Sequence, residues 1–174
     1  MALNEYGQIM RIGLRHARDA FRDSATIDTQ WQALNYHARP GYDDALAEYD
    51  AFMEALMLAG ADVHLLPYGD GLSIDSIYVR DASIPSPGGV IACNMGKPAR
   101  SAEPTVNGTG YGDQGLAVAG SIGGDGRIEG GDFIWLDDTT CAVAHGYRTN
   151  AEGIRQLRAL LGENVHVEVC PLPH

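Results

Sequence analysis

The clearest hydrophobic pattern in the chain runs from Tyr42 to Ala59, where apolar residues recur about every 3.6 positions, as on one face of a helix. The apolar positions are Tyr42, Ala45, Leu46, Tyr49, Phe52, Met53, Leu56 and Met57. Two aspartates suit the first turn of such a helix, and Gly60 suits the residue just past its end. The pattern therefore predicts a helix over residues 42–59.

A second helical stripe, formed by Ile154, Leu157, Leu160 and Leu161, ends at Gly162. Thr149 with Glu152 three residues later predicts a capping box at its start. Short apolar runs predict strands over residues 10–14, 62–66, 76–84, 89–94, 116–122, 133–136, 141–144 and 165–169, with hairpins across 85–88 and 137–139. We expect a long loop with one helical turn near Trp31 over 19–40, a turn over 123–126 and, because of its glycines, no good helix over 103–112.

These predicted elements repeat along the chain. The helix-ending residues Gly60 and Gly162 are 102 positions apart, and Asp81 and Asp132, each beside a hairpin strand, are 51 apart. The order suggests an α/β fold built from about three ββαβ-type units of roughly 51 residues, although the middle unit lacks a predicted helix. The length suits one domain over residues 1–174.

Composition narrows the kinds of partner. The formal net charge of −11 argues against nucleic acid and anionic membranes, and it favours a cationic substrate only weakly, since acidity also aids solubility. The N-terminus lacks the apolar core of a signal peptide, and the most apolar stretch, residues 51–61, is too short to span a membrane. The three cysteines, Cys93, Cys141 and Cys170, lack a Cys-x-x-Cys spacing, and we expect small buried thiols in a reducing cytoplasm.

Charged residues gather near the ends of predicted strands, namely Asp75, Arg80, Asp81, Arg100, Glu129, Asp132 and Arg148. The segment Glu129-Gly130-Gly131-Asp132 places two acids around two glycines, which permit close backbone approach. A solvated turn is the plainer interpretation of this segment, as is a simple ion pair for Asp81 beside its neighbouring arginine. Arg148 precedes a predicted helix start, where it could hold a carboxylate or lie exposed.

Four motifs in sequence resemble those of the guanidino-group-modifying superfamily, which includes arginine deiminases, dimethylarginine dimethylaminohydrolases and amidinotransferases. They are Ile77-Tyr78-Val79-Arg80-Asp81, Met95-Gly96-Lys97-Pro98-Ala99-Arg100 with Glu103, Glu129-Gly130-Gly131-Asp132, and Arg148-Thr149-Asn150. The resemblance implies a five-bladed α/β propeller (pentein) of which this chain would hold about three blades. We therefore expect the N-terminal part of such a propeller, truncated at its C-terminus, with exposed strand edges that favour association with further copies.

The resemblance also implies residue roles. Asp81 would accept the guanidinium of an arginine-like substrate at two points, and Glu129 would contact the guanidinium and orient the general-base histidine. Arg100 and Arg148 would hold the substrate α-carboxylate. Asp75 would be an acid that contacts either the substrate or a residue that holds the substrate. Asp132 would brace the turn formed by residues 129–132.

In the superfamily a late cysteine attacks the guanidinium carbon to give a covalent amidino-cysteine intermediate, and a histidine activates water, or an amine accepts the group; no metal or cofactor is implied. No cysteine of this chain matches that nucleophile. His174 lies near the place of the base, although a histidine there is more often part of a loop, and His145 is more often packed or solvated than catalytic. We therefore expect the 174-residue chain by itself to be inactive.

Two other hypotheses stay open from the sequence. The chain could be a non-catalytic module of the same fold that binds arginine-like ligands. It could also be an acidic, glycine-rich structural domain that depends on calcium, although residues 123–126 form only a single copy of the repeat that calcium binding needs.

Overall fold

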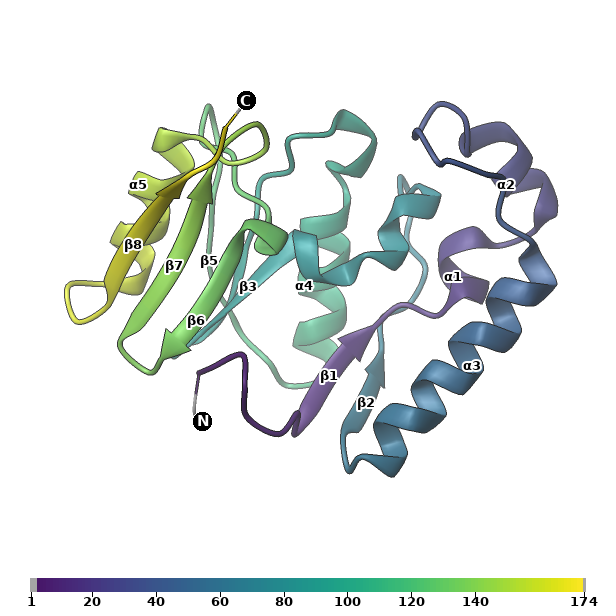
Figure 1. Ribbon diagram of the computed structural model, residues 1–174, viewed down its shortest axis with the longest axis horizontal. Helices are drawn as coiled ribbons and strands as arrows, with labels where there is room; N and C mark the ends of the chain where they lie inside the picture. The colour runs from purple at the N-terminus through teal and green to yellow at the C-terminus, as the bar shows by residue number, and fades with distance from the viewer. Residues whose placement is uncertain (1–2, 174) are drawn as a thin grey trace. The chain divides into compact units, whose positions relative to one another are not determined.

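The computed structural model describes residues 3–173, and the chain divides into two compact units (Figure 1). One unit is Gln8–Val79, and the other combines Arg80–His174 with Met1–Gly7. Whether the two units together form the single domain expected from the length stays a prediction. Among the described residues no helix has the length and apolar character needed to cross a membrane.

The Gln8–Val79 unit is built on two parallel strands, β1 (Arg11–Leu14) and β2 (Asp62–Leu65). The helix α3 (Tyr42–Leu58) connects them and confirms the predicted helix, and Gly60 follows it at a φ of +90°. The core of this unit contains Ala17, Ala20, Phe21, Ile27, Leu34 and Ile74. Only the first half of the predicted stripe, up to Tyr49, packs on that core, while Phe52 and Met57 are exposed.

The prediction of a long loop with one helical turn near Trp31 over residues 19–40 is confirmed only in part. The helix α2 (Ser24–Gln30) lies where the turn was expected, but a second short helix, α1 (Ala17–Phe21), was not predicted. The Asp23 carboxylate accepts a hydrogen bond from the backbone N–H of Thr26 at 2.7 Å and caps α2. Helices of five and seven residues are too short to show a hydrophobic period, so the cap was the only local signal.

The predicted strand over 76–84 is also shorter than expected. Its first part forms two 3₁₀ helices, Ile74–Ile77 and Val79–Ala82, and the strand β3 begins only at Ser83. Asp75 therefore lies in a 3₁₀ turn and not in a strand.

The other unit repeats one arrangement twice (Figure 1). In each copy a strand pairs antiparallel with the next, a helix follows, and a third strand pairs parallel with the second. The first copy is β3 (Ser83–Ser86), β4 (Gly89–Ala92), α4 (Glu103–Asp113) and β5 (Val118–Ser121). The second is β6 (Phe133–Asp137), β7 (Thr140–His145), α5 (Ala151–Leu161) and β8 (His166–Pro171). Both hairpins and the ββαβ order are confirmed.

The helix α4 corrects the expectation that its glycine-rich segment would not be a good helix. Pro104 sits in its first turn, where a missing N–H costs nothing. A Cβ on Gly108 would lie 3.2 Å from a methyl carbon of Val118, so the glycine lets α4 lie close against β5. Tertiary packing has outweighed the low helix propensity of glycine.

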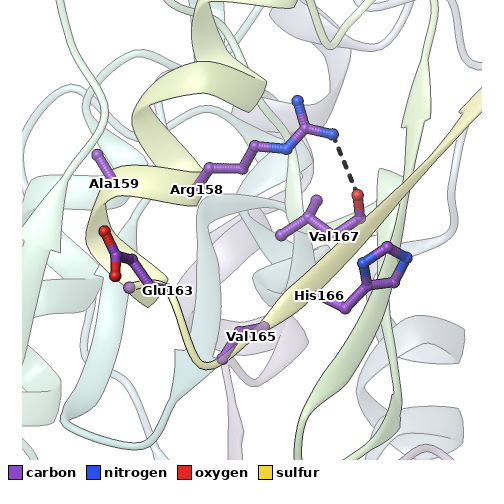
Figure 2. Close-up of a pocket in the computed structure, with 7 residues that line it drawn as sticks. Arg158, Ala159, Glu163, Val165, His166 and Val167 are labelled. Carbon is purple, nitrogen blue, oxygen red and sulfur yellow. Dashed lines mark hydrogen bonds between the residues drawn. The ribbon is translucent and has the colours of Figure 1, made fainter.

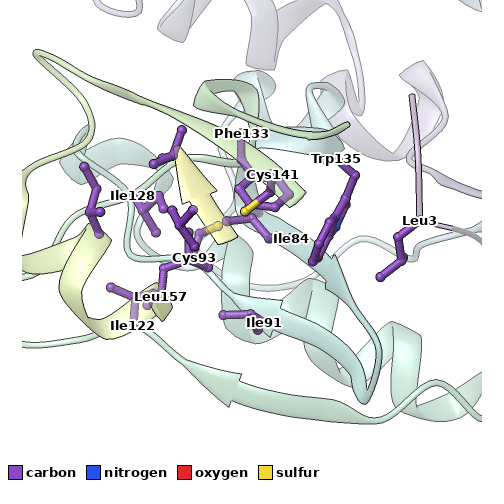
Figure 3. Close-up of a cluster of buried hydrophobic side chains, with 14 of the residues drawn as sticks. Leu3, Ile84, Ile91, Cys93, Ile122, Ile128, Phe133, Trp135, Cys141 and Leu157 are labelled. Atoms are coloured by element: carbon purple, nitrogen blue, oxygen red, sulfur yellow. The ribbon is translucent and has the colours of Figure 1, made fainter. Parts of the chain in front are cut away.

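The core of this unit joins the two copies. Trp135 of β6 is 2% exposed, donates its indole N–H to the carbonyl oxygen of Pro85 at 2.8 Å and meets Phe133 edge-on (Figure 3). Cys93 and Cys141 lie in the same core, as expected, but the prediction of burial is wrong for Cys170, which is exposed on β8. Since β8 is an edge strand of its sheet, Cys170 need not be covered.

The cap of α5 also differs from the prediction. Asn150, not Thr149, is the N-cap residue, and its side-chain oxygen accepts the N–H of Gly153 at 2.8 Å. Ile154 and Leu157 are buried, Leu160 is 40% exposed, and Gly162 ends the helix at a φ of +81°.

Candidate active site

The two glycines of the 129–132 segment bring it against the chain around Asp81. A Cβ on Gly130 would overlap the carbonyl oxygen of Arg80 and lie 2.6 Å from that of Ser83. A Cβ on Gly131 would lie 2.5 Å from the Oδ1 atom of Asp81. Residues with side chains would push the two segments apart, so this pair of glycines is what places the Asp81 carboxylate beside the turn that carries Glu129.

Asp81 is held from its other side by Arg100. The Nη1 atom of Arg100 donates to Asp81 Oδ2 at 2.6 Å, while Nε and Nη2 donate to the two carboxylate oxygens of Glu103, each at 2.8 Å. The side chains of Arg100 and Glu103 are 6% and 0% exposed. Burial alone would lower the pKa of Arg100, but Glu103 and Asp81 outweigh it and raise that pKa, so the guanidinium stays charged.

Glu129 is buried and bonded to two donors. One carboxylate oxygen accepts the backbone N–H of Gly96 at 3.2 Å, and the other accepts Nη1 of Arg148 at 2.9 Å. Burial raises the pKa of Glu129, while Arg148 and the Gly96 N–H lower it and the charge of Asp81 raises it further; the balance is an increase. Glu129 and Asp81 are thus close enough to affect each other electrostatically.

Thr149 holds the same turn in place. Its hydroxyl donates to Asp132 Oδ2 at 2.6 Å and accepts the backbone N–H of Glu129 at 3.3 Å. This role explains why Thr149 does not cap α5. The sequence pattern predicted that Thr149 caps the helix. The only sign in the sequence that Thr149 belongs to the site was its place in the Arg148-Thr149-Asn150 motif.

Arg148 differs from Arg100 in exposure. Its side chain is 49% exposed, and its Nη2 atom lies 3.9 Å from Asp132 Oδ1. It lines a depression of about 420 Å³ together with Asp132, Gly146, Tyr147, Leu172 and Pro173. Arg148 can therefore reach both a buried carboxylate and a molecule in that depression.

A second depression, of about 520 Å³, lies between the end of α5 and β8 (Figure 2). It contains none of the predicted site residues, and the guanidinium of Arg158 there donates to the carbonyl oxygen of Val167 at 3.1 Å. Of these two depressions, the one beside Arg148 adjoins the charged cluster.

Four of the five predicted site residues, Asp81, Arg100, Glu129 and Arg148, come together in one unit. The fifth, Asp75, belongs to the Gln8–Val79 unit, where it is 5% exposed. Tyr36 of that unit has a raised pKa because of its burial and then because of the nearby Asp75. Among the described residues no group of three or more His, Cys, Asp or Glu side chains could hold a metal ion.

The two buried cysteines, Cys93 and Cys141, do not have the character of nucleophiles. Burial raises the pKa of Cys93, with Glu129 and Asp81 adding to the increase, and burial raises the pKa of Cys141 to about 11. Both thiols stay protonated near neutral pH, which is unfavourable for nucleophilic attack. His145 ends β7 and is half-buried, while His174 lies outside the described residues.

The raised pKa of Glu129 predicts how stability depends on pH. A carboxyl whose pKa is higher in the folded protein stabilises it fully below its unfolded pKa of about 4.5 and loses that contribution as pH rises through the folded value. Glu129→Gln should therefore gain stability relative to the unsubstituted chain between pH 4 and pH 7, by about 1.4 kcal/mol for every tenfold difference in proton affinity between the folded and unfolded states. Urea denaturation across this range measures the difference.

Glu152→Gln is the matched control, because Arg155 and Gln156 lower the pKa of Glu152 to about 2. Its contribution is present above the unfolded pKa and is lost as pH falls, so the sign is opposite. A Glu129→Gln difference that does not change with pH would contradict the prediction.

Comparisons with known proteins find similarity to dimethylarginine dimethylaminohydrolases. Residues 19–169 match the family model described as N,N dimethylarginine dimethylhydrolase, eukaryotic. An N(G),N(G)-dimethylarginine dimethylaminohydrolase of Pseudomonas aeruginosa is 28% identical over 71% of this chain and 48% of its own length. One of Streptomyces coelicolor is 32% identical over 66% of this chain and 43% of its own. The chain therefore spans about half the length of these curated relatives.

Solved structures support the fold. The dimethylarginine dimethylaminohydrolase of Pseudomonas aeruginosa, in complex with citrulline, matches 96% of this chain and 62% of its own with a TM-score of 0.75 and 25% identity. An inosamine-phosphate amidinotransferase of Streptomyces griseus matches 97% and 61% with a TM-score of 0.70 at 15% identity, which shows the fold alone. The expected α/β fold of the pentein enzymes is confirmed over about 60% of their length, whereas the number of blades stays a prediction.

Proposed function

Because the chain belongs to the N,N dimethylarginine dimethylhydrolase family, we propose that it forms the substrate-binding part of a hydrolase acting on the guanidino group of arginine or a methylarginine. The observation that carries the proposal is that two largely buried acids, Asp81 and Glu129, lie in the same unit as the half-exposed Arg148, which pairs with Glu129. An arginine-like molecule has a cation at one end and a carboxylate at the other, so it matches this distribution of charge.

In the proposed complex Asp81 and Glu129 face the guanidinium. A carboxylate and a guanidinium can form two parallel hydrogen bonds, and these are strong where water is largely excluded, as at Asp81, whose side chain is 16% exposed. Glu129 is 1% exposed and has a raised pKa, which suits a group that can share or accept a proton near the reacting carbon.

Of the two predicted carboxylate-binding arginines, the geometry favours Arg148. Its guanidinium is half exposed beside a depression, whereas Arg100 must release Asp81 before its Nη1 atom can reach a substrate carboxylate. The role of Asp75 as a further substrate acid stays a proposal that rests on the family resemblance.

The chemistry that we propose for the whole protein proceeds through an amidino-cysteine intermediate, in which the residues of this chain bind and orient the substrate. No cysteine of this chain matches the nucleophile of the family, and burial raises the pKa of Cys93 and Cys141. We therefore expect the 174-residue chain to bind guanidino ligands without turning them over.

Calorimetric titration of the 174-residue chain with L-arginine and with agmatine, which has the guanidinium but no carboxylate, tests the proposal. Asp81→Asn should weaken both ligands at least tenfold, because the guanidinium loses its anionic partner. Arg148→Ala should weaken only L-arginine. The control is Arg155→Ala, which removes an exposed arginine paired with Glu152 and should change neither affinity.

Absence of binding of either ligand at millimolar concentration would overturn the proposal, as would equal affinities in Asp81→Asn and the unsubstituted chain. Release of citrulline from L-arginine by the 174-residue chain would leave the binding roles standing but would overturn the expectation that it lacks turnover.

A further inference from the structure

Glu103 is the most deeply buried acid of the charged cluster and lies outside the set of residues proposed to touch the substrate. It is the first residue of α4 and is 0% exposed. Both of its carboxylate oxygens accept hydrogen bonds from Arg100, at 2.8 Å from Nε and 2.8 Å from Nη2. This two-point contact fixes the plane of the guanidinium, because the five donors of that group have a rigid arrangement.

Once Glu103 fixes the guanidinium plane, the direction of the third nitrogen follows. Nη1 of Arg100 donates to Oδ2 of Asp81 at 2.6 Å, and Oδ1 of Asp81 lies against Gly131. Asp81 is therefore held on one oxygen by an arginine that cannot turn, while its other oxygen lies beside Gly131 of the neighbouring turn. Glu103 determines the orientation of Asp81 without touching it.

The net charge of Arg100, Asp81 and Glu103 also indicates a role for Glu103 in binding the substrate cation. A buried Arg100–Asp81 pair alone would be neutral, and Asp81 would then have little attraction left for a cationic ligand. With Glu103 present, two carboxylates surround one guanidinium, and the three side chains together carry one net negative charge. That remaining charge is the one that a substrate guanidinium can neutralise.

We propose that Glu103 is a positioning residue of the guanidinium site, which neutralises and orients Arg100 so that Asp81 keeps both its direction and its charge for the substrate. This inference rests on the proposed function, since it assigns Asp81 to the guanidinium.

The test compares Glu103→Gln with Glu152→Gln. Glu152 makes the same two-point contact with an arginine three residues away, but on an exposed helix surface. Glu103→Gln should weaken both L-arginine and agmatine at least tenfold in calorimetric titrations, because it removes the negative charge and leaves an amide N–H facing Arg100. Glu152→Gln should change both affinities less than about twofold.

A second measurement does not depend on ligand binding. The side-chain carboxyl ¹³C resonance of Asp81, observed by NMR in the full chain, should move in Glu103→Gln and stay in place in Glu152→Gln. If the unsubstituted chain binds no guanidino ligand, the proposed function fails, while the Asp81 resonance still decides whether Glu103 positions that carboxylate.

Unchanged affinities in a folded Glu103→Gln chain, or an unmoved Asp81 resonance, would overturn the inference. Should Glu103→Gln not fold, Glu103→Asp replaces it, because it keeps the charge but is one methylene too short for the two-point contact. Glu103→Asp should bind agmatine more weakly than the unsubstituted chain, and equal affinity would count against the inference.

Discussion

Replacement of Arg100 by methionine is expected to lower the free energy of unfolding by about 3–5 kcal/mol, the range observed when one partner of a buried ion pair is removed. The guanidinium is the shared partner of Asp81 and Glu103, and the side chain of Glu103 is 0% exposed. Methionine fills a similar volume but leaves two neighbouring carboxylates without their cation. Urea denaturation at pH 7 measures the loss.

The control for this prediction is Arg155→Met. Arg155 makes an equally short two-point contact with Glu152, but its side chain is 67% exposed, and water and salt screen exposed pairs of this kind so that they contribute little to stability. Similar losses in the two variants would mean that burial does not set the strength of the Arg100 cluster, and the prediction would be wrong.

The sequence predicted those elements whose signal is local and periodic. The helix α3, the two hairpins and the helix-ending glycines Gly60 and Gly162 all follow from spacing and turn chemistry. The repeat of roughly 51 residues is confirmed for two copies: β3 and β6 begin 50 positions apart, β4 and β7 51 apart, and α4 and α5 48 apart. A hydrophobic period shows in the sequence where one face of an element packs on a core, as the first half of α3 does.

The sequence did not predict the features that depend on contacts between residues far apart in the chain. The helix α4 forms although its glycines disfavour it, because Gly108 is needed against β5 and Glu103 is fixed by Arg100. Thr149 and Asn150 are both good capping residues, and the choice between them depends on Asp132, which takes the Thr149 hydroxyl from seventeen positions away. No local pattern contains that information.

For the candidate site, the motifs predicted which residues lie near one another better than they predicted the contacts of those residues. Asp81, Glu129 and Arg148 do gather in one unit, as the four motifs implied together. The partner that engages most of Arg100, however, is a carboxylate of the protein itself. The spacing of Arg100 and Glu103 by three residues was a visible sign of an ion pair, but only the structure shows that this pair is buried and that Arg100 also contacts Asp81.

The second large effect is expected from Gly130→Ala, which should lower the free energy of unfolding by about 3 kcal/mol, at the upper end of the usual cost of overpacking. The added methyl group would overlap the Arg80 carbonyl oxygen and lie 2.6 Å from that of Ser83. Both obstacles are backbone atoms, which cannot move aside as a flexible side chain can, so the 129–132 turn must shift away from the segment that carries Asp81.

The control is Gly112→Ala in the last turn of α4, where an added Cβ meets no atom within 4 Å. This substitution should raise the free energy of unfolding by about 0.5–1 kcal/mol, because alanine loses less backbone freedom than glycine when a helix forms. Because the same chemical change has opposite expected signs at the two glycines, the comparison separates close packing from backbone entropy.

The displaced turn should also weaken agmatine binding in Gly130→Ala, since Asp81 and Glu129 would no longer face the same guanidinium. A Gly130→Ala chain of undiminished stability and affinity would show that the close approach of Gly130 to the Arg80 and Ser83 carbonyl oxygens is not needed.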